Sequence, residues 1–238
     1  MSKRILGLFC VFTLLACCQL AGSPSQSTAG GQQEDQKMQD KKQPTRASSA
    51  ALLDPSKATE TAPATFRVKL DTTKGPVVLE VVRDWAPRGA DRFYNLVKIG
   101  FYKDVAFFRV INGFMAQFGI HGDPAVSAKW RDARIPDDPV RQSNLRGFVS
   151  FAMGGPNTRT TQLFINYADN ARLDSMGFPP FARVIQGMEN IDLLYSEYGE
   201  GAPSGAGPSQ RMVQLEGNAY LRASFPKLDY IKTATIVE

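Results

Sequence analysis

Short runs in which apolar and polar residues alternate recur from residue 66 onward, and they restrict the possible folds more than any other feature. In the segment 66–82, Phe66, Val68 and Leu70 fall on one face before a Thr-Thr-Lys-Gly turn and a second alternating run. Such alternation is typical of strands that bury one face, and the turn joins this pair into a hairpin. Further short strands are expected at residues 105–111, 114–118, 147–152, 162–166, 181–185, 212–215 and 230–237.

Helical periodicity is confined to a few segments. Between residues 84 and 102, Phe93 and Leu96 share a face, Pro87 lies near the start and Gly100 follows as a candidate C-cap. Many short strands with few helices predict a mainly β fold, either an antiparallel sandwich or a closed barrel with two main helices beside it. The other expected segments are a helix at 187–198, a short helix near 218–224, an irregular stretch at 119–146 and a Gly/Pro/Ser-rich loop at 199–209.

The scarcity of histidine and cysteine excludes several kinds of active site. His121 is the single histidine and is expected to be an exposed loop residue, and all three cysteines lie within the first 18 residues. Catalytic triads, Cys-His pairs, histidine metal sites and disulfides are therefore not expected in the rest of the chain. Carboxylates are scattered, and the net charge of +5 arises without a basic cluster. Neither acid–base hydrolysis nor nucleic-acid binding is predicted.

The amino-terminal segment has the layout of an export signal. Lys3 and Arg4 precede an apolar run at 5–16, which is too short to span a bilayer as a mature helix. The run ends in Leu-Leu-Ala-Cys, which resembles the bacterial lipobox, so Cys17 is the predicted lipidation site. An ordinary signal peptide cut near Ala21 and an uncleaved anchor are the alternatives.

Residues 18–63 are predicted to form a flexible linker. They are rich in Ser, Gln, Gly, Ala and charges of both signs and have no hydrophobic periodicity, so they bury too little surface to offset the entropy of ordering. The expected organisation is a lipoprotein signal peptide at 1–17, this linker at 18–63 and a folded domain at 64–238. The domain would be exported and lipid-anchored to the cell envelope membrane, facing the periplasm or the extracellular space.

The segment AFFRVINGFMAQFG at 106–119 has the most unusual polar residues. It is typical of two strands around a turn, yet Arg109 and Gln117 interrupt its apolar runs, and burying an arginine is costly unless its charge is used. Rotation about an X–Pro bond suits such a site, because its barrier of about 18–20 kcal/mol is amide resonance and no bond is made or broken. A charged hydrogen bond of about 1.5–3 kcal/mol is comparable with the roughly 4 kcal/mol that a thousandfold acceleration needs.

The residues around Arg109 also carry a family resemblance. FFRVINGFMAQFG, followed further along by GFVSFAMGGPNTRTTQLFIN, resembles the cyclophilins, which are peptidyl-prolyl cis-trans isomerases. The segments RFYNLVKIGFYKDVAFFRV and PPFARVIQGMENID agree with it, and the carboxy-terminal segment resembles the ending of a bacterial member. The resemblance covers residues 64–238. It implies a closed, eight-stranded antiparallel β-barrel that isomerises X–Pro bonds in exported or unfolded proteins without a metal or cofactor.

The resemblance further implies roles for individual residues. Arg109 matches the catalytic arginine that donates to the prolyl nitrogen, and Gln117 and Gln162 match glutamines that orient the arginine and the substrate backbone. The family's proline pocket is matched by Phe114, Met115, Phe164 and Leu173. The strand that binds the peptide main chain is matched by Ala152 and Met153.

A few positions depart from the family pattern. Met153 replaces the usual asparagine, Phe108 replaces a histidine beside the arginine, and a histidine expected near Phe178 is missing. Arg172 stands where many members have a tryptophan, so strong binding of cyclosporin is not expected. None of these changes removes Arg109.

One register prediction follows from placing Arg109 beside Gln117. An ideal two-residue turn at the Asn-Gly pair 112–113 would set Arg109 opposite Ala116 and point Gln117 to the other face. A connection of three residues sets Arg109 opposite Gln117. We therefore expect a longer or bulged connection, despite the strong Asn-Gly signal for a tight turn.

Two rival functions remain open at this point. A peptide-binding chaperone or scaffold would grip extended chains with weak or no isomerase activity, and an unrelated β-barrel receptor for small ligands would not act on proline peptides at all. The isomerase interpretation predicts a monomer. Its partners would be proline-containing polypeptides and, through lipidated Cys17, a membrane, but no nucleic acid.

Overall fold

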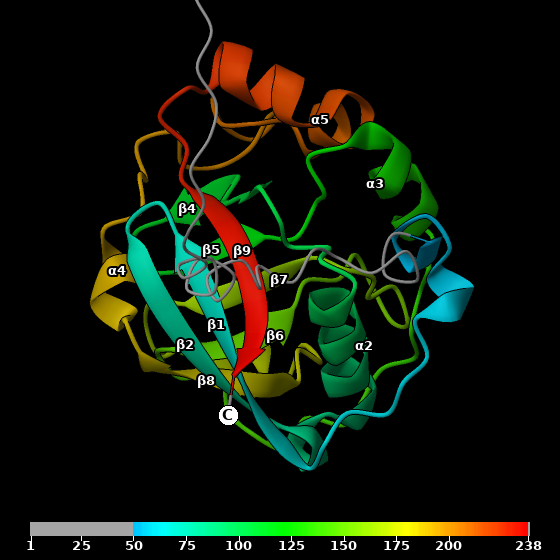
Figure 1. Ribbon diagram of the computed structural model, residues 1–238. Helices are drawn as coiled ribbons and strands as arrows, with labels where there is room; N and C mark the ends of the chain where they lie inside the picture. Colours follow the sequence, from blue (N-terminus) through cyan, green and yellow to red (C-terminus); the bar gives the residue numbers. More distant parts are fainter. Residues whose placement is uncertain (1–49, 238) are drawn as a thin grey trace, which may run out of the picture. The chain divides into compact units, whose positions relative to one another are not determined.

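The computed structural model describes residues 50–237, and one antiparallel sheet of nine strands forms its centre (Figure 1). The strands follow each other across the sheet in the order β3-β9-β1-β2-β8-β6-β7-β5-β4. Their bounds are β1 (Thr65–Thr72), β2 (Gly75–Val82), β3 (Val105–Ala106), β4 (Arg109–Ile111), β5 (Met115–Phe118), β6 (Phe148–Phe151), β7 (Leu163–Asn166), β8 (Pro180–Gln186) and β9 (Tyr230–Val237).

The sheet is open, and this corrects the closed, eight-stranded barrel that the sequence predicted. Strand order ends at β3 on one side and at β4 on the other, and within residues 50–237 no ladder joins these two strands. Only Phe107 and Phe108 separate them along the chain. The Phe107 N–H donates to the carbonyl of Asp229 (2.9 Å), so the chain still follows β9 just before it enters β4. Covalent continuity, rather than hydrogen bonding, links the two edges.

The α-helices between residues 53 and 237 are α2 (Pro87–Lys98), α3 (Pro124–Trp130), α4 (Met188–Asp192) and α5 (Gln210–Ser224). In Figure 1, α5 and α3 lie together at the top of the view and α2 lies lower, beside the sheet. Single 3₁₀ turns lie at Pro55–Lys57, Arg83–Trp85 and Ala171–Leu173, and residues 50–52 are also helical.

Three of these helices differ from the sequence predictions. α5 replaces the expected strand at 212–215 and short helix at 218–224, and α4 is much shorter than the expected helix at 187–198. α3 lies in the stretch expected to be irregular. Its start carries a signal that the sequence contains, because Asp123 accepts from the Ala125 N–H and a proline occupies the first turn.

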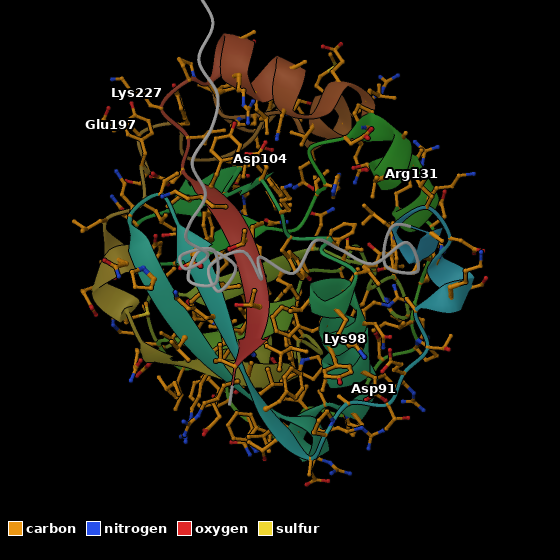
Figure 2. The ribbon with its side chains drawn as sticks, viewed as in Figure 1. Asp91, Lys98, Asp104, Arg131, Glu197 and Lys227 are labelled. Carbon is orange, nitrogen blue, oxygen red and sulfur yellow. The ribbon has the colours of Figure 1, made fainter. Side chains whose placement is uncertain are left out.

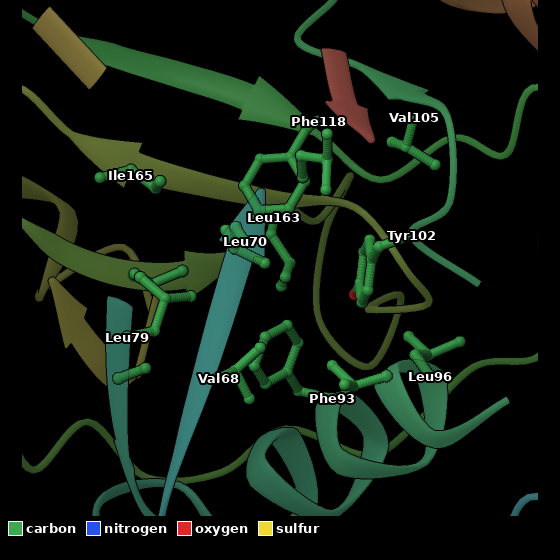
Figure 3. Close-up of a cluster of buried hydrophobic side chains, with 14 of the residues drawn as sticks. Val68, Leu70, Leu79, Phe93, Leu96, Tyr102, Val105, Phe118, Leu163 and Ile165 are labelled. Atoms are coloured by element: carbon green, nitrogen blue, oxygen red, sulfur yellow. The ribbon is translucent and has the colours of Figure 1, made fainter. Parts of the chain in front are cut away.

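The core lies between the sheet and α2. Figure 3 shows Phe93 and Leu96 of α2 in one cluster with Val68, Leu70 and other strand side chains, all of them buried. The helical period of α2 and the alternation of β1 and β2 direct these apolar residues to the same interior. Burying each such side chain stabilises the fold by about 1.5–3 kcal/mol.

Part of the segment expected to be a linker belongs to the folded unit. Residues 50–52 are helical, and the indole Nε1 of Trp130 donates to the carbonyl of Leu52 (2.8 Å). The side chain of Asn95 on α2 bonds both backbone groups of Glu60, at 3.0 and 2.7 Å. Residues 50–63 therefore pack on the domain that was expected to begin at 64.

The remaining amino-terminal predictions fall on other residues. The signal peptide at 1–17 with Cys17, and the linker up to residue 49, lie outside the described residues. Within residues 50–237, no helix combines the length and the apolar character needed to cross a bilayer.

Candidate active site

β4 and β5 are joined by a connection of three residues, not by the ideal two-residue Asn-Gly turn. Arg109 pairs with Gln117, and residues 112–114 join the strands. The Phe114 N–H donates to the Ile111 carbonyl (3.0 Å), and Gly113 has a φ of 72°, a left-handed conformation that favours glycine. The register prediction is confirmed, and it places Arg109 and Gln117 on the same face of the two strands.

Three polar side chains form a chain of hydrogen bonds on this face. Nη1 of Arg109 donates to Oε1 of Gln117 (3.0 Å), and Nε2 of Gln117 donates to Oε1 of Gln162 (2.9 Å). Gln117 is only 6% exposed, so both ends of its amide need partners within the protein. Gln162 therefore fixes the orientation of Gln117, and Gln117 in turn faces its oxygen to the guanidinium.

An apolar pocket lies next to the guanidinium. Met115, Phe164 and Leu173 form a small buried cluster apart from the main core, and Phe114 packs against it. The cavity above this cluster measures about 570 Å³, within the range typical of ligand pockets. Every site residue predicted between 109 and 173 lines it: Arg109, Phe114, Met115, Gln117, Ala152, Met153, Gln162, Phe164 and Leu173.

The end of β6 forms one rim of the cavity. The Ala152 N–H donates to the Gln162 carbonyl (2.9 Å), which extends the pairing beyond Phe151 by one residue. Met153 follows along the rim, and the Gly154 N–H donates to Oγ1 of Thr158 (3.0 Å) in the next turn. The backbone at residues 152–154 therefore runs along the edge of the cavity.

The cavity has other lining residues, some of them unpredicted. Arg172 lies over the ring of Phe114, with its Cζ 4.8 Å from the ring centroid, and Phe178 packs edge-on against Phe164. Phe108, by contrast, is buried in a second apolar cluster with residues of α5 and does not line the cavity. Besides Arg172 and Phe178, the lining residues that the sequence did not single out for peptide binding are Gly154, Thr158, Thr160, Met176 and Gln210.

A carboxylate from a distant loop holds the other edge of the Arg109 guanidinium. Glu200 accepts from Nε (2.6 Å) and Nη2 (2.7 Å), which makes a bidentate ion pair. The hydrogen bonds from Arg109 hold the pKa of Glu200 below its usual value. Sequence reasoning missed Glu200, because it lies 91 positions from Arg109 in a Gly-rich segment expected to be a flexible loop.

A family model ties this site to known proteins. The model described as "Cyclophilin type peptidyl-prolyl cis-trans isomerase/CLD" matches residues 67–214, which include Arg109, both glutamines and the whole apolar pocket. The chain belongs to this family. In this cyclophilin the candidate site lies where the edge strand β4 turns into β5, and residues that follow β6 and β7 complete the lining of its cavity.

Individual relatives agree with the family model. "Peptidyl-prolyl cis-trans isomerase CYP18-1" of Arabidopsis thaliana is 35% identical over 133 residues, which are 53% of this chain and 81% of that protein. "Peptidyl-prolyl cis-trans isomerase-like 3" of Homo sapiens is 34% identical, also over 133 residues, with 53% and 80% covered. These relatives are eukaryotic, and they give no support to the bacterial, lipoprotein-like character expected from the chain ends.

A solved structure supports the fold. A crystal structure of a cyclophilin type peptidyl-prolyl cis-trans isomerase from Cryptosporidium parvum has a TM-score of 0.55 and 23% identity, covering 73% of this chain and 98% of that one. At this identity the likeness concerns the fold alone. It agrees with a mainly β architecture of antiparallel strands and a few helices.

Proposed function

We propose that this cyclophilin isomerises X–Pro peptide bonds in exported or unfolded proteins, with Arg109 as the catalytic group. The observation that carries the proposal is the guanidinium itself, held by Gln117 and Glu200 at the wall of an apolar cavity. The proline ring enters the pocket beside Met115 and Phe164. An N–H of Arg109 then donates to the prolyl nitrogen.

The physical basis is preferential binding of the twisted amide. Twisting ends the amide resonance and leaves a lone pair on the prolyl nitrogen, so a donor there stabilises the transition state more than the planar ground states. With only 20% of the Arg109 side chain exposed, little water competes for that donor. One charged hydrogen bond contributes about 1.5–3 kcal/mol toward lowering a barrier of roughly 18–20 kcal/mol.

The substrate binds as an extended chain. Its main chain lies along Ala152 and Met153, which follow the end of β6, in the manner of an added strand. Gln162 reaches the same cavity from the start of β7 and contacts the substrate backbone. Recognition by backbone groups and one proline pocket suits many different unfolded chains.

The proposal includes attachment to an envelope membrane. The Leu-Leu-Ala-Cys sequence after the apolar leader supports cleavage before Cys17 and its lipidation, which would leave the domain, as a monomer, on the outer side of that membrane. Mass spectrometry of the mature chain tests this directly. A lipid-modified Cys17 is expected, and an unmodified amino terminus elsewhere would remove the anchor.

A protease-coupled assay on a proline tetrapeptide tests the activity. The full chain is expected to accelerate cis-to-trans conversion in a saturable manner. Suppression of aggregation of an unfolded protein, without any acceleration of isomerisation, would instead favour a peptide-binding chaperone. A chain active in neither assay would favour a small-ligand receptor.

A further inference from the structure

The loop that presents Glu200 to Arg109 has a defined fold. The Gly207 N–H donates to the Glu200 carbonyl (2.8 Å), and the Ala202 N–H donates to the Gly207 carbonyl (3.1 Å). A Cβ atom at Gly205 or Gly207 would lie 2.4 or 2.8 Å from the Glu200 carbonyl oxygen. Only glycine allows the chain to fold back this closely. The glycines that made this segment look like a flexible loop therefore allow it to form a compact one.

The Glu200 carboxylate is held by its own loop as well as by Arg109. The Gly201 N–H donates to Oε1 (2.9 Å), the same oxygen that accepts from Nε of Arg109. Arg109 itself begins the edge strand β4, whose backbone pairs with β5 alone among the strands described between residues 50 and 237. A long side chain on a short edge strand has many rotamers, and the loop supplies the second anchor that limits them.

The ion pair leaves the guanidinium able to act. Glu200 and Gln117 accept from three of its five N–H groups, and Nη1 also donates to the weakly accepting Sδ of Met115 (3.6 Å). Nη2 keeps a second N–H beside the one that it donates to Glu200. Glu200 does not line the cavity, so its carboxylate does not fill the space needed by a proline ring. The contact therefore orients Arg109 rather than blocking the site.

We propose that Glu200 is a positioning residue of the isomerase reaction. It clamps the Nε–Nη2 edge of Arg109, so that the second N–H of Nη2 stays directed to the prolyl nitrogen. The inference rests on the proposed function, because it assigns Glu200 a part in the reaction of Arg109. Holding a donor in its productive geometry raises the rate, since each unproductive rotamer removes the donor from the transition state.

Glu200→Gln tests the clamp, because the amide has one acceptor oxygen where the carboxylate has two, and its NH2 group would face an N–H of the guanidinium. In the tetrapeptide assay kcat is expected to fall by about tenfold with KM little changed. Glu200→Asp, which keeps the charge, is expected to recover part of the loss. Glu197→Gln is the matched control: Glu197 is exposed, lies at the periphery near Lys227 (Figure 2), accepts from the hydroxyl of Tyr195, and should leave kcat unchanged.

A double-mutant cycle separates positioning from a general structural effect. If Glu200 acts through Arg109, Glu200→Gln causes no further loss of kcat in an Arg109→Ala background. An active wild-type protein whose Glu200→Gln variant has unchanged or increased kcat would overturn the inference while leaving the proposed function intact. An additional tenfold loss in the Arg109→Ala background would also overturn it. An inactive wild-type protein would overturn the proposed function and the inference together.

Discussion

At the scale of single residues, Arg109 shows how a charge is kept where little water reaches it. An unpaired guanidinium at such a position would be costly, but Glu200 and Gln117 satisfy three of its donors in the absence of substrate. The apolar pocket wall beside it lowers the local dielectric. A hydrogen bond to the prolyl nitrogen is therefore stronger there than it would be in water.

His121 makes the stability of the domain depend on pH. Its ring is half-buried against Phe101 rather than exposed as expected, and Nδ1 accepts from the Asp123 N–H (2.9 Å), which requires an unprotonated nitrogen. Burial lowers its pKa below the usual 6.5, so the unfolded chain binds a proton more readily than the folded one. The stabilisation is complete above pH 6.5 and declines as pH falls toward the folded-state pKa.

The measurement is urea unfolding between pH 7.5 and 5. The free energy of unfolding should decrease as the pH falls through the usual histidine pKa of 6.5, because the unfolded chain takes up the proton first. Because His121 is the single histidine, His121→Asn, whose Oδ1 can accept the same bond, should flatten this decrease. An equal slope in both proteins would contradict the assignment.

The sequence predicted the register that pairs Arg109 with Gln117, but it did not predict the long-range contact between Arg109 and Glu200. Arg109 and Gln117 are joined by a short connection, so strand alternation alone decides whether they share a face. Glu200 reaches Arg109 through a loop fold that depends on glycine contacts, and nothing in the alternation or period of the chain indicates that contact.

At the scale of elements, the start of α2 depends on a residue far away in the sequence. Its N-cap Ala86 has no side-chain acceptor, and the backbone N–H groups of Arg88 and Gly89 donate to Asp138 instead (3.1 and 2.9 Å). The same carboxylate accepts from Nη2 of Arg159 (3.0 Å), and both charged side chains are fully buried. Asp138 therefore joins the irregular segment, α2 and the turn before β7.

Asp138→Ala is expected to destabilise the domain strongly. It leaves Arg159 buried without this carboxylate and leaves two N–H groups of α2 unsatisfied, at a cost of about 3–5 kcal/mol. Asp132→Ala is the control, because Asp132 is exposed and its ion pair with Arg131 should contribute less than about 1 kcal/mol. Similar losses for the two variants in urea unfolding would show that the buried network is not important.

Gly217 determines how α5 packs. Its φ of 58° breaks the helical geometry within α5, and a Cβ there would lie 2.0 Å from the carbonyl oxygen of Gly122. Gly217→Ala should lower the free energy of unfolding by about 2 kcal/mol or more through strain and overlap. Gly154→Ala, with no atom within 4 Å of the added methyl group, should change it by less than about 1 kcal/mol. Equal thermal midpoints for the two variants would contradict this account.

Gly217 also helps to explain why α5 was not predicted from the sequence. The run 212–215 is too short to distinguish a strand from a helical turn, and Gly217 interrupts the period that would have joined it to 218–224. α2 was predicted because Phe93 and Leu96 keep an uninterrupted period. The short α3 was missed although the Asp-Pro pair at 123–124 is a typical helix start.

At the scale of the whole molecule, the curled sheet brings its two edges together at the site. Phe107 packs in the main core and Phe108 in the second cluster near α5, so the chain between β3 and β4 is held on both sides just before Arg109. The sequence predicted where the strands lie better than whether the sheet closes into a barrel. Alternation shows which side chains face inward, but it does not show whether the two edge strands pair with each other. An open edge at β4 is also where the Glu200 loop reaches Arg109.

The most direct test of the central claim is the effect of Arg109→Ala on catalysis and on binding. With a proline tetrapeptide, kcat/KM is expected to fall by about 10- to 150-fold, the equivalent of one charged hydrogen bond of about 1.5–3 kcal/mol. The dissociation constant of the peptide should change little, because the pocket of Met115, Phe164 and Leu173 remains. Arg134→Ala, which removes an exposed arginine, should match the wild type. An Arg109→Ala protein with wild-type kcat/KM would contradict the account.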